Sequence, residues 1–142
     1  MKKLFVIAFI CSTYSLTACT QKLKEAEVPG AAKAAFQKQY PNTKASWEKE
    51  KGNYEVNFKK DGKIMSSVID KNGAILETET DITVSALPTS VQTYVKDHYK
   101  GAKIKEAAEI VRANGERIYE AEVGGKDVLF DANGKFLKEV KD

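Results

Sequence analysis

The chain carries few side chains that could do acid–base or metal chemistry near neutral pH. It has one histidine, His98, and two cysteines, Cys11 and Cys19. A zinc site needs more histidine or cysteine ligands than these. His98 has the only ordinary pKa suited to acid–base work at this pH, but its place just before Tyr99 fits a polar helix flank better. We therefore expect no metal, no cofactor and no catalysis by histidine or cysteine.

Carboxylates offer a second route to catalysis. Glu120 and Glu122 alternate along one predicted strand, and glycosidases use a pair of carboxylates. The basic neighbours Arg117 and Lys126 favour a different interpretation, in which the two glutamates lie on the solvated face of a sheet. We therefore do not expect a glycosidase.

Two Asp-x-Asn-Gly motifs, at residues 70–73 and 131–134, have the beginning of a calcium-binding loop. An EF-hand loop needs further oxygen ligands and a glutamate at its twelfth position, whereas each motif here has only the length of a hairpin. Asn-Gly tolerates the positive φ that tight hairpin turns require. We interpret both motifs as turns, and we predict that the chain is not an enzyme.

Length and charge limit the class of protein. The 142 residues include 23 Lys+Arg and 20 Asp+Glu, and the formal net charge is +3. Lys2 and Lys3 lie in a segment predicted below to be removed, which leaves 21 basic and 20 acidic residues. A nucleic-acid-binding protein normally has a clustered basic face, so we expect no nucleic-acid partner. With 42% hydrophobic and 30% charged residues, one globular domain with a modest core is expected.

The N-terminus has the pattern of an export signal. Two lysines precede an apolar run, residues 4–11, which is too short to span a bilayer and suits a signal peptide. Residues 16–19, Leu-Thr-Ala-Cys, then resemble a bacterial lipobox, whose cysteine receives the lipid and becomes the mature N-terminus. We predict a lipoprotein-type signal peptide over residues 1–18, cleaved before Cys19, and a polar tether over residues 19–27.

The export signal predicts where the protein resides. A lipid on Cys19 would hold the protein on a membrane, in the periplasm or associated with the outer membrane; the alternative is plain secretion. Cys11 leaves with the signal peptide and Cys19 is used by the lipid. The mature domain then has no disulfide, although an exported protein could form one, and its core must supply its stability.

The rest of the chain contains an internal sequence repeat. The segment from Val28 to Tyr40 has a counterpart 59 residues later, and the two Asp-x-Asn-Gly motifs are 61 residues apart. The order of matching positions is kept, and the small differences in length fall at turns. We therefore predict one domain over residues 28–141, built from two repeats at 28–80 and 87–141.

Each repeat is expected to be a helix followed by four antiparallel strands. Apolar residues first recur at every fourth position, as on one face of a helix. They are Val28, Ala32, Phe36 and Tyr40 in the first repeat, and Leu87, Val91, Val95 and Tyr99 in the second. The period then changes to two between Gly-containing turns, which is typical of short strands with one apolar and one charged face. The expected fold class is α+β, with each helix covering the apolar face of its strands.

This pattern resembles a known family. The tandem helix-plus-four-strand unit, its leading Val-Pro or Leu-Pro and its Asp-x-Asn-Gly turn resemble the PepSY-like, β-lactamase-inhibitor-protein-like (BLIP-like) domain of small secreted bacterial proteins. The resemblance covers residues 28–141. It implies helices on one face of a curved antiparallel sheet, and it implies binding rather than catalysis.

The resemblance also implies a mode of binding. The named inhibitors hold an enzyme with the open sheet face and its loops, and PepSY modules elsewhere occur in peptidase propeptides. The present chain departs from the named inhibitors because its domain lacks disulfides and has no loop that matches a segment inserted into an active site. Inhibition of a β-lactamase itself is therefore not expected.

The open sheet face is the expected docking surface for a protein of the cell envelope, an enzyme among the candidates. The residues expected to line it are Glu55, Asn57, Lys59, Glu120 and Glu122. Trp47 fits either the core or an exposed aromatic anchor of the kind enriched at binding hot spots. The sequence thus predicts a non-catalytic, lipid-anchored protein-binding or inhibitory module. The alternative is an envelope structural or scaffold protein with no enzyme target.

Overall fold

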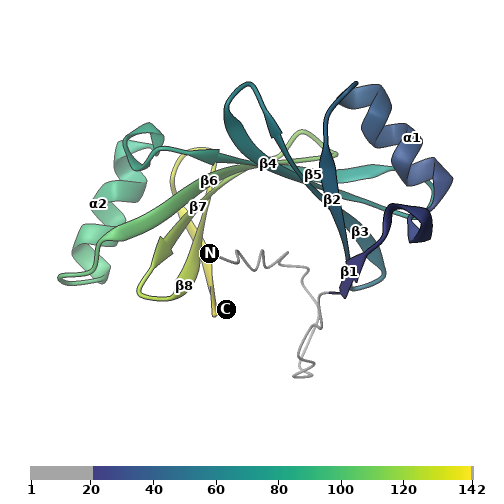
Figure 1. Ribbon diagram of the computed structural model, residues 1–142. Helices are drawn as coiled ribbons and strands as arrows, with labels where there is room; N and C mark the ends of the chain where they lie inside the picture. The colour runs from purple at the N-terminus through teal and green to yellow at the C-terminus, as the bar shows by residue number, and fades with distance from the viewer. Residues whose placement is uncertain (1–20, 142) are drawn as a thin grey trace. The chain divides into compact units, whose positions relative to one another are not determined.

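A computed structural model describes residues 21–141 (Figure 1). The predicted signal peptide, residues 1–18, and the predicted lipidation site, Cys19, lie outside the described residues. In chain order the elements are β1 (Gln21–Leu23), η1 (Glu25–Glu27), α1 (Gly30–Gln39), β2 (Ala45–Glu50), β3 (Asn53–Lys60), β4 (Lys63–Ile69), β5 (Ile75–Ile82), η2 (Val84–Ala86), α2 (Thr89–His98), β6 (Ile104–Arg112), β7 (Arg117–Val123), β8 (Lys126–Asp131) and β9 (Phe136–Lys141), where η marks a 3₁₀-helix.

The predicted fold class, two balanced repeats of one helix and four strands with helices on one face of a curved sheet, is wrong. The strands of residues 21–141 belong to one nine-stranded antiparallel sheet in the order β1 to β9. The α-helices are a small part of the described chain, since α1 and α2 have ten residues each. Two separate four-stranded sheets would each leave unpaired strand edges, and a continuous sheet pairs them. β1 is a ninth strand, made by residues that the sequence assigns to the tether, and it pairs with β2.

The described chain divides into two compact units. The first unit holds residues 21–80 and 111–115, and the second holds residues 81–110 and 116–141. Each unit contains one α-helix and has its own hydrophobic core. Stability can therefore be argued separately for each unit.

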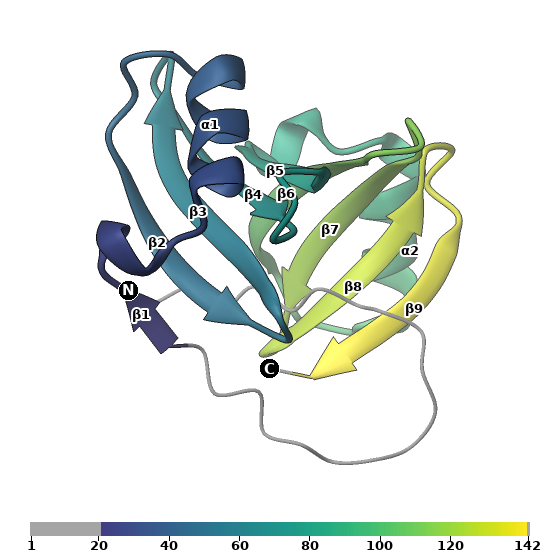
Figure 2. The ribbon, with the colours of Figure 1, turned by 90° about the vertical axis from the view of Figure 1, so that its right-hand side faces the viewer.

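In the first unit, α1 packs on one face of β2, β3 and β4 (Figure 2). The buried side chains of this core are Val28, Ala32, Phe36, Trp47, Val56, Phe58 and Ile69. The Phe36 ring meets the Trp47 and Phe58 rings edge-on, with centroids 5.7 and 5.1 Å apart. Such aromatic pairs add to the stabilisation that burial alone provides. The predicted helical stripe is thus the face that anchors α1.

In the second unit, α2 packs against β6, β7 and β8 in the same manner. Its buried side chains are Leu87, Val91, Val95, Ala107, Ala121, Val123, Val128 and Phe130. Tyr94 adds to this face, because its ring stacks on Phe136 at 5.1 Å and meets Phe130 edge-on at 5.4 Å. The apolar stripe predicted for residues 87–99 therefore also faces a core.

The two Asp-x-Asn-Gly motifs are turns, as predicted, between β4 and β5 and between β8 and β9. In the first, one carboxylate oxygen of Asp70 accepts hydrogen bonds from the backbone N–H groups of Asn72 and Ala74, both at 2.8 Å. These bonds, the one from Ala74 above all, hold the pKa of Asp70 below its ordinary value. Asp131 accepts the corresponding pair at 2.9 Å. The aspartates are thus occupied in closing turns.

Glycine ends each motif because the beginning of a helix lies close to it. A Cβ atom on Gly73, whose φ is +88°, would lie 2.7 Å from the carbonyl oxygen of Ala31 in α1. A Cβ atom on Gly134, whose φ is +78°, would collide with the Ser90 hydroxyl in α2. That hydroxyl donates a hydrogen bond of 3.0 Å to the carbonyl oxygen of Asn133. Each turn is therefore a contact between sheet and helix as well as a chain reversal.

Candidate functional site

The first part of the candidate site is the sheet face of the first unit that lies opposite α1. Alternate apolar residues of β3, from Tyr54 to Phe58, pack toward α1. Because side chains alternate along a strand, Glu55, Asn57 and Lys59 lie on the other face. Their exposure rises along the strand: Glu55 is buried, Asn57 is half-buried and Lys59 is exposed. The three predicted residues share a face, but their access to solvent differs.

Strand pairing brings a second carboxylate to Glu55. The hairpin between β2 and β3 turns at Lys51 and Gly52, which have φ of 49° and 88°. This turn places Glu48 directly opposite Glu55. Glu50 lies two residues beyond Glu48 on the same strand, and hence on the same face. Sequence reasoning missed Glu48 and Glu50, although the Gly52-Asn53 turn signal fixes this register.

The pKa of the Glu55 carboxyl group is strongly raised. Burial above all, together with the negative charges of Glu50 and Glu48, raises its pKa from 4.5 to about 7. A hydrogen bond with the Ser66 side chain acts in the opposite direction. Removal from water and nearby like charges both disfavour the ionised form. Glu55 therefore changes protonation near neutral pH.

In the second unit, the predicted residues Glu120 and Glu122 lie on β7, on the face opposite Ala121 and Val123, which pack in the core. Both glutamates are half-buried. The Lys105 ammonium lies 2.9 Å from the Glu122 carboxylate. These residues therefore form part of a charged, partly solvated sheet face, as their sequence pattern predicts.

An apolar cluster accompanies these glutamates on the second unit. Ile110, Ile118 and Leu129 are buried together, and Val140 packs against them. Ile118 shares the parity of Glu120 and therefore lies on the same face of β7. The face of the second unit opposite α2 thus combines carboxylates with aliphatic side chains.

Trp47 lies in the core of the first unit, where 6% of its surface is exposed. Of its two interpretations, the structure supports the core position. Its edge also lines a cavity of about 390 Å³ beside α1. The remaining lining residues include Phe36 and the charged side chains of Glu25, Lys33 and Lys44. Sequence reasoning did not find this cavity, because η1, β2 and α1 meet there only in the folded chain.

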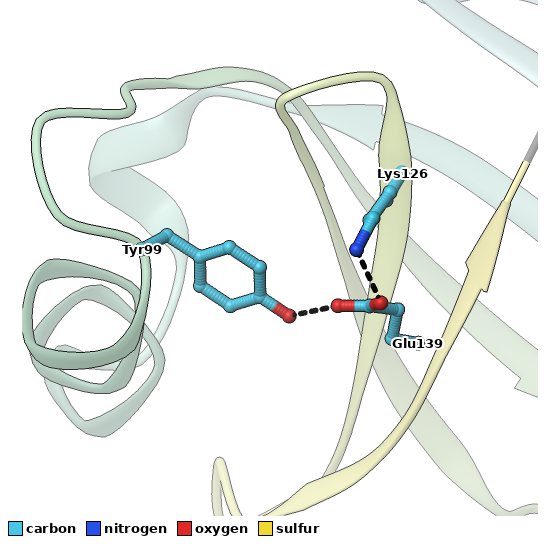
Figure 3. Close-up of polar contacts among 3 residues, drawn as sticks. All are labelled: Tyr99, Lys126 and Glu139. Carbon is cyan, nitrogen blue, oxygen red and sulfur yellow. Dashed lines mark hydrogen bonds and ion pairs between the residues drawn. The ribbon is translucent and has the colours of Figure 1, made fainter.

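A three-residue polar network closes the end of α2 (Figure 3). The Tyr99 hydroxyl donates a hydrogen bond of 2.6 Å to one oxygen of Glu139, and the Lys126 ammonium lies 2.5 Å from the other. Burial and this hydrogen bond raise the pKa of Tyr99 to about 12, while Lys126 and Tyr99 lower that of Glu139. The network keeps the tyrosine protonated and ties α2 to β8 and β9. The sequence gives no sign of it, since Tyr99 and Glu139 are 40 residues apart.

His98 occupies the polar helix flank predicted for it. Its ring stacks on Tyr94 at 3.9 Å, and its Nδ1 lies 2.9 Å from the Tyr94 carbonyl oxygen. Within residues 21–141, no group of three or more His, Cys, Asp or Glu side chains is arranged to hold a metal ion. None of the helices in this part of the chain is long and apolar enough to cross a bilayer.

Solved structures with the same fold come from Bacteroides. A BLIP-like protein from Bacteroides fragilis NCTC 9343 is 27% identical, with 78% of this chain and 84% of that chain covered and a TM-score of 0.61. A protein from Bacteroides eggerthii DSM 20697, assigned provisionally to the periplasm, is 18% identical, with 79% and 87% covered and a TM-score of 0.72. A DUF2874 family protein from Bacteroides uniformis ATCC 8492 is 21% identical, with 78% and 87% covered and a TM-score of 0.71.

A comparison with curated proteins found no match. A family model, described as beta-lactamase-inhibitor-like and PepSY-like, matches the chain twice, over residues 15–77 and 67–138. Together the two matches take in most of the sequence, and they overlap only around the end of β4 and the beginning of β5. The resemblance inferred from the Asp-x-Asn-Gly turns is thereby confirmed: the chain belongs to the PepSY-like, beta-lactamase-inhibitor-like family.

Proposed function

We propose that this chain is a non-catalytic lipoprotein of the cell envelope that binds another envelope protein through its open sheet face. The observation that carries this proposal is the pair of sheet faces opposite α1 and α2. One bears buried and half-buried glutamates, and the other bears the aliphatic cluster of Ile110, Ile118 and Leu129. Each face, taken by itself, also bears polar side chains that water reaches only in part, Glu48 and Asn57 on the first and Glu120 and Glu122 on the second, as at the rim of a protein interface.

Family membership supports binding over catalysis. The fragilis relative is described as BLIP-like, and an inhibitor works by docking rather than by turnover. Two carboxyl groups with lowered pKa values are already occupied by structural hydrogen bonds. Glu139 is engaged by Tyr99 and Lys126, and Asp70 by its own turn.

The proposed location in the envelope rests on the N-terminal sequence. The lipobox at residues 16–19 supports a lipid on Cys19. The eggerthii relative, assigned provisionally to the periplasm, supports export. The partner is therefore sought among proteins of the periplasm and the membranes that face it.

The test is to capture the partner from an envelope extract and then reverse charges on each face. A variant with Lys59→Glu and Glu120→Lys should lose the captured partner, because both residues lie on the proposed docking faces. The control variant, Lys33→Glu with Lys96→Glu, changes the helices and should keep the partner. Circular dichroism checks that both variants fold. Loss of binding only in the helix variant would overturn the docking face, and hydrolysis abolished by a single carboxylate substitution would overturn the non-catalytic assignment.

A further inference from the structure

Three glutamates on the first unit form a group that we call the acidic cluster: Glu48, Glu50 and Glu55. Glu48 and Glu55 are direct cross-strand partners in β2 and β3. The Cβ atoms of such a pair lie roughly 5 Å apart, and like charges in this position destabilise a sheet. Glu50 adds a third carboxylate on the same face. The cluster therefore opposes the folding of the strands that carry it.

Burial makes the cluster more unfavourable. Glu55 is 3% exposed and Glu50 is 7% exposed. Each has one satisfied oxygen, since Ser66 bonds to Glu55 and the Lys51 ammonium lies 3.4 Å from Glu50. The other oxygen of each, Oε1 of Glu55 and Oε2 of Glu50, is buried and has no hydrogen-bond partner. A buried carboxylate oxygen without a donor is costly, and native proteins keep few of them.

Strand carboxylates outside the acidic cluster are paired with cations on both units, and on the first unit Arg112 lies 3.7 Å from Glu77. Arg117 lies 2.5 Å from Glu109, Lys105 lies 2.9 Å from Glu122, and Lys126 lies 2.5 Å from Glu139. Ion pairs of this kind would be enough to neutralise the carboxylates of the acidic cluster if the cluster had no other role. For the acidic cluster itself, the structure shows an ion pair between Glu50 and Lys51, whose side chain is 45% exposed. Two buried oxygens of the cluster, Oε2 of Glu50 and Oε1 of Glu55, are thus acceptors without a hydrogen-bond donor.

We propose that the acidic cluster receives a cationic side chain, an arginine or a lysine, from the protein partner. Charge complementarity carries the choice of occupant, because the vacant acceptors are carboxylate oxygens on one face. Glu48 is half-buried and forms the outer contact, while Glu50 and Glu55 lie deeper. A guanidinium group has five donors in a planar fork that matches carboxylates, and arginine is enriched at binding hot spots. The inference rests on the proposed function and specifies what the partner must present.

A peptide titration tests the inference. The purified full chain, labelled with ¹³C at glutamate carboxyl groups, is titrated by NMR with acetyl-Gly-Arg-Gly-amide. The comparison peptide carries citrulline, which has the shape of arginine without its charge. Because a bound cation favours the ionised carboxylate, the arginine peptide should lower the pKa of Glu55 from about 7 by one unit or more. The citrulline peptide should leave it unchanged.

Two variants locate the effect. Glu48→Gln should weaken the response to the arginine peptide at least fivefold, whereas Glu25→Gln, an exposed position on η1, should not change it. Equal responses to both peptides, or an undiminished response in Glu48→Gln, would overturn the inference. A response to calcium ions without any response to arginine would also overturn it, in favour of a metal ligand. If the captured partner requires Lys59 and Glu120 but tolerates Glu48→Gln, the inference fails and the proposed function stands.

Discussion

The carboxyl group of Glu55 couples the stability of the first unit to pH. Its pKa is 4.5 in the reference state and about 7 in the folded protein. Between these values the folded chain holds a proton that the unfolded chain has released. The free energy of unfolding therefore falls as pH rises through this range, and the stabilisation is complete only below about pH 4.5.

Replacing Glu55 by glutamine should remove this pH dependence. We expect Glu55→Gln to raise the free energy of unfolding at pH 8 by about 2–3 kcal/mol, since the neutral amide needs no charge to be buried. At pH 4.5 the variant and the parent should differ little. Urea denaturation at the two pH values measures both quantities, and Glu25→Gln is the exposed control. A parent protein as stable at pH 8 as at pH 5 would contradict the shifted pKa.

Three individual residues show which features of the site could be predicted from the sequence and which could not. The alternation of β3 assigned Glu55 to the face opposite α1, but periodicity does not report depth, and the burial of Glu55 comes from the packing around it. The charged sequence neighbours of Trp47 fit both a core and an exposed position, and its contact with Phe36 in the folded chain decides for the core. The bond from Tyr99 to Glu139 depends on tertiary structure alone.

At the scale of elements, each helix is held by a few apolar side chains. Phe36 is 2% exposed and contacts the rings of Tyr40, Trp47 and Phe58. We expect Phe36→Ala to lower the free energy of unfolding by about 3–5 kcal/mol, as large-to-small changes in cores do. Gln37→Ala, at an exposed position of the same helix, is the control. A loss below about 1 kcal/mol, measured by chemical denaturation, would show that α1 is not anchored by this stripe.

The turn between β4 and β5 gives a second prediction at this scale. Gly73 and Gly115 both have positive φ, at 88° and 82°, but only the Cβ of a residue at 73 would meet backbone, the carbonyl of Ala31. The left-handed conformation should lower the free energy of unfolding of both Gly→Ala variants by about 1–2 kcal/mol. Gly73→Ala should lose about 1–3 kcal/mol more, because α1 must shift. Equal melting temperatures for the two variants would contradict the close approach of turn and helix.

The sequence predicted the elements better than their assembly. The stripes of Phe36 and Val95 and the Asp-x-Asn-Gly turns are local patterns, and local periodicity is enough to find them. The joining of all strands into one sheet depends on pairing between segments far apart in the chain. β1 precedes η1 and α1 as the end of β5 precedes η2 and α2. It has only three residues, however, of which Leu23 alone is apolar, so periodicity could not find it.

At the scale of the whole molecule, two family matches correspond to two units with separate cores. A copy of roughly 55 residues buries too small a fraction of its surface to be more than marginally stable. Continuous pairing from β1 to β9 removes internal edges, which would otherwise invite aggregation. The continuous sheet thus joins two cores that would each be small on their own.

The last prediction concerns how the molecule is held in the envelope. If residue 19 receives the lipid, Cys19→Ser should abolish lipid labelling and release the protein from the membrane fraction. The fold should be unchanged, because the core of the first unit, among the described residues, begins at Leu23 and Val28. Metabolic labelling with a fatty acid, followed by fractionation of cells, measures both effects. Cys11→Ser is the matched control, since Cys11 would leave with the signal peptide, and it should keep both the label and the membrane location. A Cys19→Ser protein that remains in the membrane fraction would show that something other than a lipid on this residue holds it there.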